Sequence, residues 1–168
     1  PVAIKIEYFV NKVRFTREVN NWNKNFQDER KEYLINIDLK ADMQIKPIQP
    51  SCLFKKLREI IPEDAIKTMD AGTLCLQATD SLNYFKPKSL FTPLDFGLVG
   101  FSYSCGLGVK IANPSRPVIS LMSEGWFGMT HSEISTEVSH SINTVTLVLD
   151  NKCWVAENAY QRAVIGKR

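Results

Sequence analysis

Two polar side chains follow two apolar runs, and their chemical types suit the binding of a hard cation. The apolar run 118–122 ends two positions before Glu124, and the run 144–149 ends two positions before Asn151. Both runs have the composition and length of buried strands. Magnesium prefers oxygen ligands and keeps open positions for phosphate oxygens, so a carboxylate and an amide are suitable ligands. The pattern predicts a magnesium and phosphate site if both strands end at the same edge of a sheet.

A helix between the two runs would bring their ends to one edge. Residues 130–133 read Thr-His-Ser-Glu, the form of a capping box, and three apolar residues follow at four-residue spacing: Ile134, Val138 and Ile142. Strand, helix and strand form a βαβ unit, and its parallel strands present their carboxyl ends where ligands of α/β sheets bind. We therefore expect the two polar side chains to converge, with the N-H groups of a helix N-terminus facing the same phosphates.

The rest of the chain continues this alternation of strands and helices. The pattern predicts a helix over 51–60, a strand over 65–69 and a helix over 73–84. A turn then leads to an apolar pair at 90–91, and residues 101–112 form a helix rich in small side chains. These elements predict an α/β fold, a three-layer domain with a mainly parallel sheet.

The N-terminal part differs in character from the rest. Prolines 47 and 50 mark a linker, so we assign residues 1–46 to the tail of a preceding linker region and residues 47–168 to the α/β domain. Residues 2–6 have the composition of a strand. Four apolar residues then recur at helical spacing among charged ones and predict an amphipathic helix: Phe15, Val19, Trp22 and Phe26.

Composition narrows the classes of protein and of partner. A chain of 168 residues with 44% hydrophobic content suits one domain with a substantial core. The 21 basic residues barely exceed the 18 acidic ones and form no stripe interleaved with aromatics, so we expect no nucleic-acid partner. The sequence has no long apolar span, no secretory signal and no paired or zinc-type spacing among its four cysteines. We expect no membrane partner and a cytoplasmic location.

The spacing of 27 positions between Glu124 and Asn151 resembles the metal and diphosphate motif of thiamine diphosphate-dependent enzymes. That motif opens with Gly-Asp-Gly and closes with Asn-Asn. Here it reads Ser123-Glu124-Gly125 and Asp150-Asn151, so the spacing is kept while three of five letters differ. The resemblance identifies the domain as the C-terminal, diphosphate-binding domain of this family.

Further segments follow in the family's order. They are residues 69–73, 95–100 and 110–117. Within the family, residues 124–129 and 151–157 are most similar to sulfoacetaldehyde acetyltransferases. The resemblance implies a thiamine diphosphate and Mg²⁺ cofactor pair, and acetyl transfer to phosphate with release of sulfite.

The resemblance also implies a role for each matching position. Glu124 and Asn151 would bind the metal through their side chains, and Cys153 would bind it through its backbone carbonyl. Val99 matches the bulky apolar residue that supports the bent cofactor, and Gly97 lies beside the aminopyrimidine ring. The remaining matches lie beside the diphosphate: Gly72, Thr73, Ser123, Gly125 and Trp126.

The family's active sites form between two kinds of domain, and a pyrimidine-binding domain supplies the activating glutamate. We find no such domain here, so we expect a fragment, incomplete at the C-terminus, that is inactive alone and needs a pyrimidine-binding domain or subunit. A truncated sheet leaves an unpaired edge, which predicts a homo-oligomer, a dimer or larger.

Two kinds of alternative stay open, and a third is disfavoured. An acetolactate synthase or a 2-oxo acid decarboxylase fits the same motif letters. A non-catalytic scaffold that has lost cofactor binding is favoured by the altered motif, because glutamate is one methylene longer than aspartate and a serine at position 123 would be strained if φ were positive there. The glycines 106 and 108 superficially suggest a dinucleotide-binding motif, but without a third glycine they fit close packing in a helix better.

Overall fold

The computed structural model describes residues 20–42, 44–93 and 95–166, and the chain divides into two compact units, 1–40 and 41–168. In the first unit, the helix α2 spans Asn20–Leu39 and confirms the expected helix over its described part. Trp22 and Phe26 are exposed and stack with ring centroids 5.6 Å apart. The other two apolar positions of the stripe and the strand expected at 2–6 lie outside the described residues.

The second unit is built on a four-stranded sheet whose paired strands are all parallel, in the order β2-β1-β3-β4. The α/β fold with a mainly parallel sheet is therefore confirmed. The central strands β1 and β3 are buried almost throughout. The strand expected over 144–149 is present as β4, but its expected burial is wrong, because β4 is an edge of the described sheet and none of its residues is buried. The strands are β1 (Ile66–Met69), β2 (Leu90–Phe91), β3 (Val118–Ser123) and β4 (Val145–Leu149).

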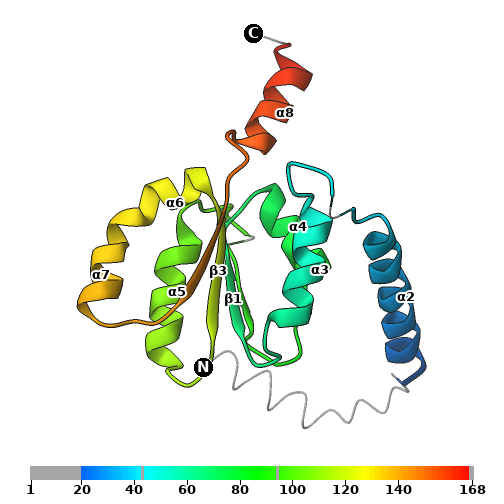
Figure 1. Ribbon diagram of the computed structural model, residues 1–168, viewed down its shortest axis with the longest axis horizontal. Helices are drawn as coiled ribbons and strands as arrows, with labels where there is room; N and C mark the ends of the chain where they lie inside the picture. Colours follow the sequence, from blue (N-terminus) through cyan, green and yellow to red (C-terminus); the bar gives the residue numbers. More distant parts are fainter. Residues whose placement is uncertain (1–19, 43, 94, 167–168) are drawn as a thin grey trace. The chain divides into compact units, whose positions relative to one another are not determined.

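Helices cover both faces of the sheet and complete three layers (Figure 1). On one face lie α3 (Pro50–Ile60) and α4 (Thr73–Ser81). On the other lie α5 (Phe101–Ala112), α6 (Glu124–Thr130), the 3-10 turn η1 (His131–Glu133) and α7 (Ile134–Ser139). The helix α8 (Val155–Val164) follows β4.

Each face of the sheet has its own apolar core. Met69 and Leu121 pack under Phe54 of α3 and Ala78 of α4. The opposite core lies under α5 and α6 and contains Tyr103, Leu107, Met122, Trp126 and Ile142. Because β1 and β3 are covered on both faces, they read as continuous apolar runs, as parallel strands should.

The helix α5 approaches the sheet closely at Gly106. A β-carbon built on Gly106 would lie 2.2 Å from Oγ of Ser120 on β3 and 3.2 Å from Oγ1 of Thr68 on β1. Thr68 donates its hydroxyl to the Ser102 carbonyl at 2.8 Å, and its Oγ1 also lies within hydrogen-bond distance of Oγ of Ser120, at 2.9 Å. The close packing expected of this glycine is confirmed, whereas Gly108 faces open space.

The connection between β3 and β4 differs from the expected single helix. The chain enters α6 at Glu124, six residues before the expected start, and Thr130 makes no side-chain cap hydrogen bond. Ile134 and Val138 are 43% and 72% exposed, while Ile142 is buried beyond the end of α7. The expected capping box and buried stripe are thus wrong, because Trp126 and Phe127 of α6 pack against the core in their place.

None of the helices in the described part of the chain is long and apolar enough to cross a membrane. The four cysteines are free thiols, with Cys52 and Cys75 buried and Cys153 exposed.

Candidate functional site

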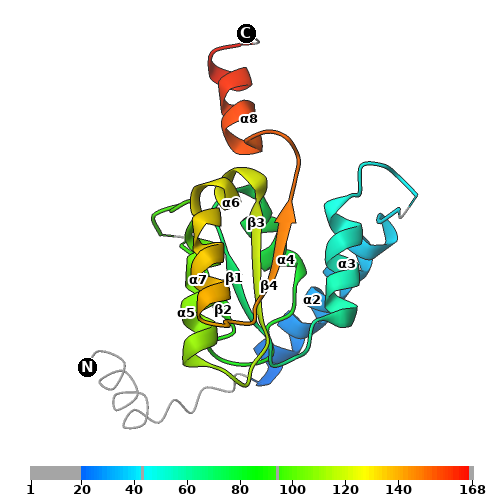
Figure 2. The ribbon, with the colours of Figure 1, turned by 60° about the vertical axis from the view of Figure 1, so that its left-hand side comes forward.

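The predicted site residues fall in the loops at the carboxyl ends of the parallel strands. Gly72 and Thr73 follow β1 at the start of α4, and Val99 lies in the connection from β2 to α5. Glu124 follows β3, and Asn151 follows β4, which runs toward α8 (Figure 2). A parallel sheet gathers these loops at one edge, where ligands of α/β folds bind.

Glu124 and Asn151 lie side by side at this edge. The backbone N-H of Asn151 donates a hydrogen bond to Oε2 of Glu124, with an N to O distance of 3.4 Å. The register of the sheet explains the contact, because Ser123 pairs with Leu149 and the next residues of both strands leave the sheet together. The structure therefore brings together the two positions that the sequence predicts as metal ligands.

The loop after β4 is a compact turn that exposes oxygen atoms. Oδ1 of Asn151 accepts a hydrogen bond from the N-H of Cys153 at 3.0 Å, and Oδ1 of Asp150 accepts one from the N-H of Lys152 at 2.9 Å. Lys152 has a φ of 58° at the top of this turn. An amide oxygen has a second lone pair, so Oδ1 of Asn151 keeps capacity for a further partner.

Trp126 ties the loop after β1 to the first turn of α6. Its indole N-H donates a hydrogen bond to the carbonyl oxygen of Ala71 at 3.1 Å, and its ring is buried. Gly72 has a φ of 94°, which favours glycine, and a β-carbon there would lie 3.8 Å from Nε1 of Trp126. Two of the predicted diphosphate loops are thus in direct contact.

Trp154 packs on Gly125 and was not predicted as a site residue. A β-carbon built on Gly125 would lie 2.3 Å from Nε1 of Trp154 and 3.0 Å from its Cδ1. The centroids of the Trp126 and Trp154 rings are 4.7 Å apart, with 60° between their planes. Trp154 is nevertheless 46% exposed, because it lies at the rim of the edge. The glycine of the acidic motif is compatible with a close approach, but it does not indicate which residue approaches.

Ser123 takes the place of the motif's first glycine without backbone strain. Its φ is −85° and its ψ is 165°, an extended conformation that every residue adopts. The strain considered for this position is therefore absent, and the first altered letter of the motif does not argue against the site.

Val99 and Gly97 lie in the connection that leads into α5. Val99 packs against the core cluster that contains Trp126. Gly97 has a φ of 64°, and its N-H donates a hydrogen bond to the carbonyl of Pro93 at 2.8 Å. Within the described ranges, no hydrogen bond joins Gly97 or Thr73 to the pair formed by Glu124 and Asn151, so their proposed roles depend on the resemblance.

Asp70, at the end of β1, is a buried carboxylate whose role the sequence did not reveal. Its Oδ1 accepts a hydrogen bond from the N-H of Phe101 at 2.6 Å, at the first turn of α5. Burial raises the pKa of Asp70 to about 6, although hydrogen bonds from the backbone of Phe101, Ser102 and Gly100 lower it. An aspartate directly after a buried strand was the signal that could have identified this cap.

A cluster of three or more His, Cys, Asp or Glu side chains suited to a metal does not occur within 20–42, 44–93 and 95–166. The candidate ligands at the strand edge are of another kind: one carboxylate, one side-chain amide and one backbone carbonyl. These hard oxygen donors suit magnesium, which takes few protein ligands when phosphates supply the others. The residues present therefore fit the cation that the motif implies.

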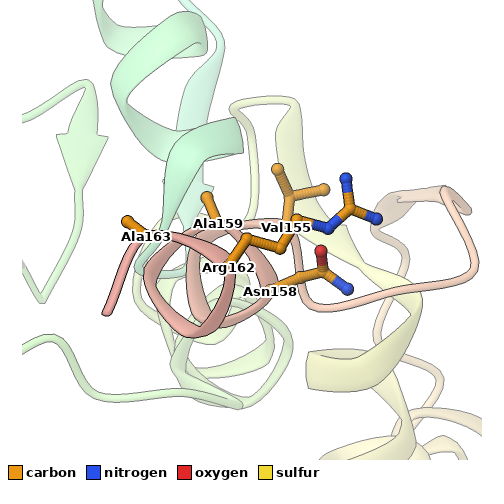
Figure 3. Close-up of a pocket in the computed structure, with 5 residues that line it drawn as sticks. All are labelled: Val155, Asn158, Ala159, Arg162 and Ala163. Atoms are coloured by element: carbon orange, nitrogen blue, oxygen red, sulfur yellow. The ribbon is translucent and has the colours of Figure 1, made fainter. Parts of the chain in front are cut away.

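A hollow beside α8 is a separate feature. Its lining side chains all come from one helix, and Figure 3 shows them along that helix: Val155, Asn158, Ala159, Arg162 and Ala163. None of them is a predicted site residue. A surface walled by a single helix does not enclose a ligand, so we do not assign it to the cofactor.

Comparison with known proteins identifies the family of this chain. Residues 70–168 match the family model of the thiamine pyrophosphate enzyme, C-terminal TPP binding domain. The sulfoacetaldehyde acetyltransferase of Castellaniella defragrans is 30% identical over 152 residues, which cover 88% of this chain and 25% of that protein. The acetolactate synthase of Mycobacterium leprae is 27% identical over 119 residues, which cover 71% of this chain and 19% of that protein.

A solved structure shows the same fold. The thiamine diphosphate-dependent 4-hydroxybenzoylformate decarboxylase of Rhodococcus jostii RHA1 superimposes with a TM-score of 0.66 at 21% identity, covering 72% of this chain and 23% of that one. The chain thus spans about a fifth to a quarter of the length of these proteins.

The parallel sheet, covered by helices on both faces, defines a three-layer α/β domain of the kind that binds ligands at the carboxyl edge of its strands. The chain belongs to the thiamine diphosphate-dependent enzyme family and matches its C-terminal cofactor-binding domain.

Proposed function

We propose that this chain is the diphosphate-binding part of a thiamine diphosphate- and magnesium-dependent enzyme that transfers acetyl groups from sulfoacetaldehyde to phosphate with release of sulfite. The contact between Oε2 of Glu124 and the N-H of Asn151 carries the proposal, because it joins the two ends of the motif at the ligand edge of the sheet. The similarity to the sulfoacetaldehyde acetyltransferases of Castellaniella defragrans and Alcaligenes xylosoxydans xylosoxydans supports the choice of substrate.

The cation would be held by a carboxylate, an amide and a main-chain carbonyl: those of Glu124, Asn151 and Cys153. A glutamate in place of the usual aspartate adds one methylene. Since Glu124 already reaches the backbone of Asn151, its longer side chain spans the gap between the two loops. The protein contributes charge and position here, while diphosphate oxygens complete the coordination.

The diphosphate would lie against the loops joined by Trp126. Gly72 leaves room for close approach of backbone to ligand, whereas the space at Gly125 is taken by the ring of Trp154. The first turn of α4 offers the N-H groups after Thr73. Ser123 adds a hydroxyl beside them. Val99, which is held by the core, would support the bent cofactor, and Gly97 would meet the aminopyrimidine ring.

The cofactor itself performs the difficult chemistry. Thiamine diphosphate, when bound, supplies a nucleophilic carbon and stabilises carbanion character at the substrate carbonyl. The residues of this chain bind and orient its diphosphate. We propose that a pyrimidine-binding domain or subunit completes the active site, that the chain alone is inactive, and that it works in the cytoplasm.

Tryptophan fluorescence tests cofactor binding directly, because Trp126 and Trp154 lie at the proposed site. In a Trp22→Phe background, thiamine diphosphate with Mg²⁺ should quench the emission, and Glu124→Gln should weaken cation affinity about tenfold or more by removing the charge. Glu157→Gln, in the first turn of α8, is the matched control and should bind normally. Equal binding by Glu124→Gln and the parent protein would refute the assigned metal site.

The same experiment separates the alternatives. A folded protein that shows no quenching at saturating cofactor identifies a scaffold that has lost cofactor binding. If binding occurs, reconstitution with a pyrimidine-binding partner allows activity to be assayed with sulfoacetaldehyde and phosphate, or with pyruvate. Turnover of pyruvate alone would favour an acetolactate synthase or a 2-oxo acid decarboxylase.

A further inference from the structure

Trp154 lies close to two of the proposed cation ligands, Cys153 and Glu124. It is the residue directly after Cys153, and its ring rests on Gly125, the residue directly after Glu124. A peptide unit is planar, so the carbonyl of Cys153 and the N-H of Trp154 share one plane. Anchoring Trp154 therefore restricts the direction in which the Cys153 carbonyl points.

Beyond the pairing of Ser123 with Leu149, few contacts among the described residues hold the loop after β4 against α6. Residues 150–153 are exposed, and the hydrogen bonds of Asp150 and Asn151 close turns within the loop itself. The link from Asn151 to Glu124 is long, at 3.4 Å, and a neutral donor at that distance contributes little. The aromatic contact between Trp154 and the first turn of α6 is thus the main side-chain restraint on this loop, in addition to the pairing of β4 with β3.

The contact continues into a third loop. Trp154 packs against Trp126 with the ring centroids 4.7 Å apart, and Trp126 donates its indole N-H to the carbonyl of Ala71. Such aromatic pairs stabilise a contact beyond the effect of the area that they bury. The pair therefore connects the loops after β1, β3 and β4 through a rigid bridge.

We propose that the Trp126–Trp154 pair is a positioning device, in which Trp154 docked on Gly125 sets the Asn151 side chain and the Cys153 carbonyl against Glu124 for cation binding. The inference rests on the proposed function, since it concerns the same cation. Trp154 acts through its neighbours and touches neither the cation nor the substrate. Groups that orient metal ligands typically change metal affinity about 10- to 100-fold when they are removed.

Mn²⁺ serves as the probe, because its free concentration can be measured by electron paramagnetic resonance, and Mg²⁺ can then be added as a competitor. The 168-residue chain is compared with Trp154→Ala, Trp154→Phe and Gly125→Ala, each in the presence of thiamine diphosphate. Trp22→Ala is the matched control, because this exposed tryptophan lies in the first unit. Thermal unfolding verifies that each variant is folded.

We expect Trp154→Ala to weaken Mn²⁺ binding about 10- to 100-fold, and Trp154→Phe to retain more of the affinity than alanine does. Two indoles at this separation also couple in circular dichroism. The coupled signal should disappear in Trp154→Ala, and in Gly125→Ala as well, where the new methyl group displaces the ring. Gly125→Ala should lose Mn²⁺ affinity together with that signal, although Trp154 is still present.

Two results would overturn the inference in distinguishable ways. If the parent chain binds Mn²⁺ and folded Trp154→Ala binds it equally well, the positioning role is wrong and the proposed function stands. If neither the parent chain nor any variant binds Mn²⁺, and Glu124→Gln behaves identically, the proposed function fails and the inference fails with it.

Discussion

Asp70 lies at the end of β1, and one of its carboxylate oxygens accepts the N-H of Phe101 at 2.6 Å, while the other, Oδ2, is buried without a partner in the described part of the chain. The contact joins the carboxyl edge of the sheet to the start of α5. A buried charge with one unsatisfied oxygen is costly, which is why burial raises the pKa of Asp70 to about 6.

This raised pKa predicts a specific dependence of stability on pH. The unfolded chain releases the proton of Asp70 near its usual value of 3.8, whereas the folded chain keeps it until about pH 6. The folded state binds more protons in this interval, so the contribution of Asp70 to stability falls as pH rises from about 4 to 6, by about 1–3 kcal/mol. Urea unfolding at several pH values should show this slope reduced in Asp70→Asn. The exposed Asp95→Asn should keep the slope of the parent protein, and a parallel pH profile for both variants would contradict the assignment.

The close approach of α5 to the sheet predicts opposite effects at two neighbouring glycines. Gly106→Ala places a methyl group 2.2 Å from Oγ of Ser120 and should destabilise the fold by about 1–3 kcal/mol through overpacking. Gly108→Ala, which meets open space on the same helix, should stabilise it by about 1 kcal/mol through helix propensity. Urea unfolding of both variants checks the pair, and a stabilising Gly106→Ala would show that α5 lies farther from β3.

Tyr103 on α5 donates its hydroxyl to Oε2 of Glu137 on α7, and Oε1 of the same carboxylate accepts the hydroxyl of Thr144 at 2.6 Å. Tyr103→Phe removes a hydrogen bond to a charged group and should cost about 1.5–3 kcal/mol of unfolding free energy at neutral pH.

Burial, together with the hydrogen bond and charge of Glu137, raises the pKa of the Tyr103 hydroxyl. The unfolded chain therefore ionises first, and the stability contributed by this tyrosine should decline as pH rises above about 10. Tyr103→Phe should flatten the alkaline limb of the stability profile. An unchanged decline of stability above about pH 10 in Tyr103→Phe would mean that the Tyr103 hydroxyl does not cause this decline.

The edge strand β4 predicts self-association. Val145 and Val148 are 54% and 40% exposed on a strand whose outer edge is unpaired in the described sheet. Exposed apolar edges invite pairing with another chain, so we propose a dimer or larger oligomer. Light scattering should show that Val148→Lys lowers the average mass, while Leu76→Lys on the exposed face of α4 leaves it unchanged. A monodisperse monomer at high concentration would refute the proposal.

Much of the fold was predictable because it depends on local pattern. The buried strand β3 and the helix α5 agree with the sequence to within a residue, since a continuous apolar run and a run of small apolar residues each specify one kind of element. The start of α6 was not predictable. A capping box at 130–133 looked like a helix start, but the packing of Trp126 against the core decided that the helix begins at Glu124.

The sequence by itself determined that Glu124 and Asn151 follow neighbouring parallel strands, because a βαβ crossover leaves both carboxyl ends on one edge. Only the tertiary structure decided how the loops at that edge are held. The ring of Trp154 over Gly125, the indole of Trp126 on Ala71 and the cap of Asp70 on α5 join residues far apart in the chain. Such contacts depend on side-chain volume and direction in three dimensions, which no spacing along the chain encodes.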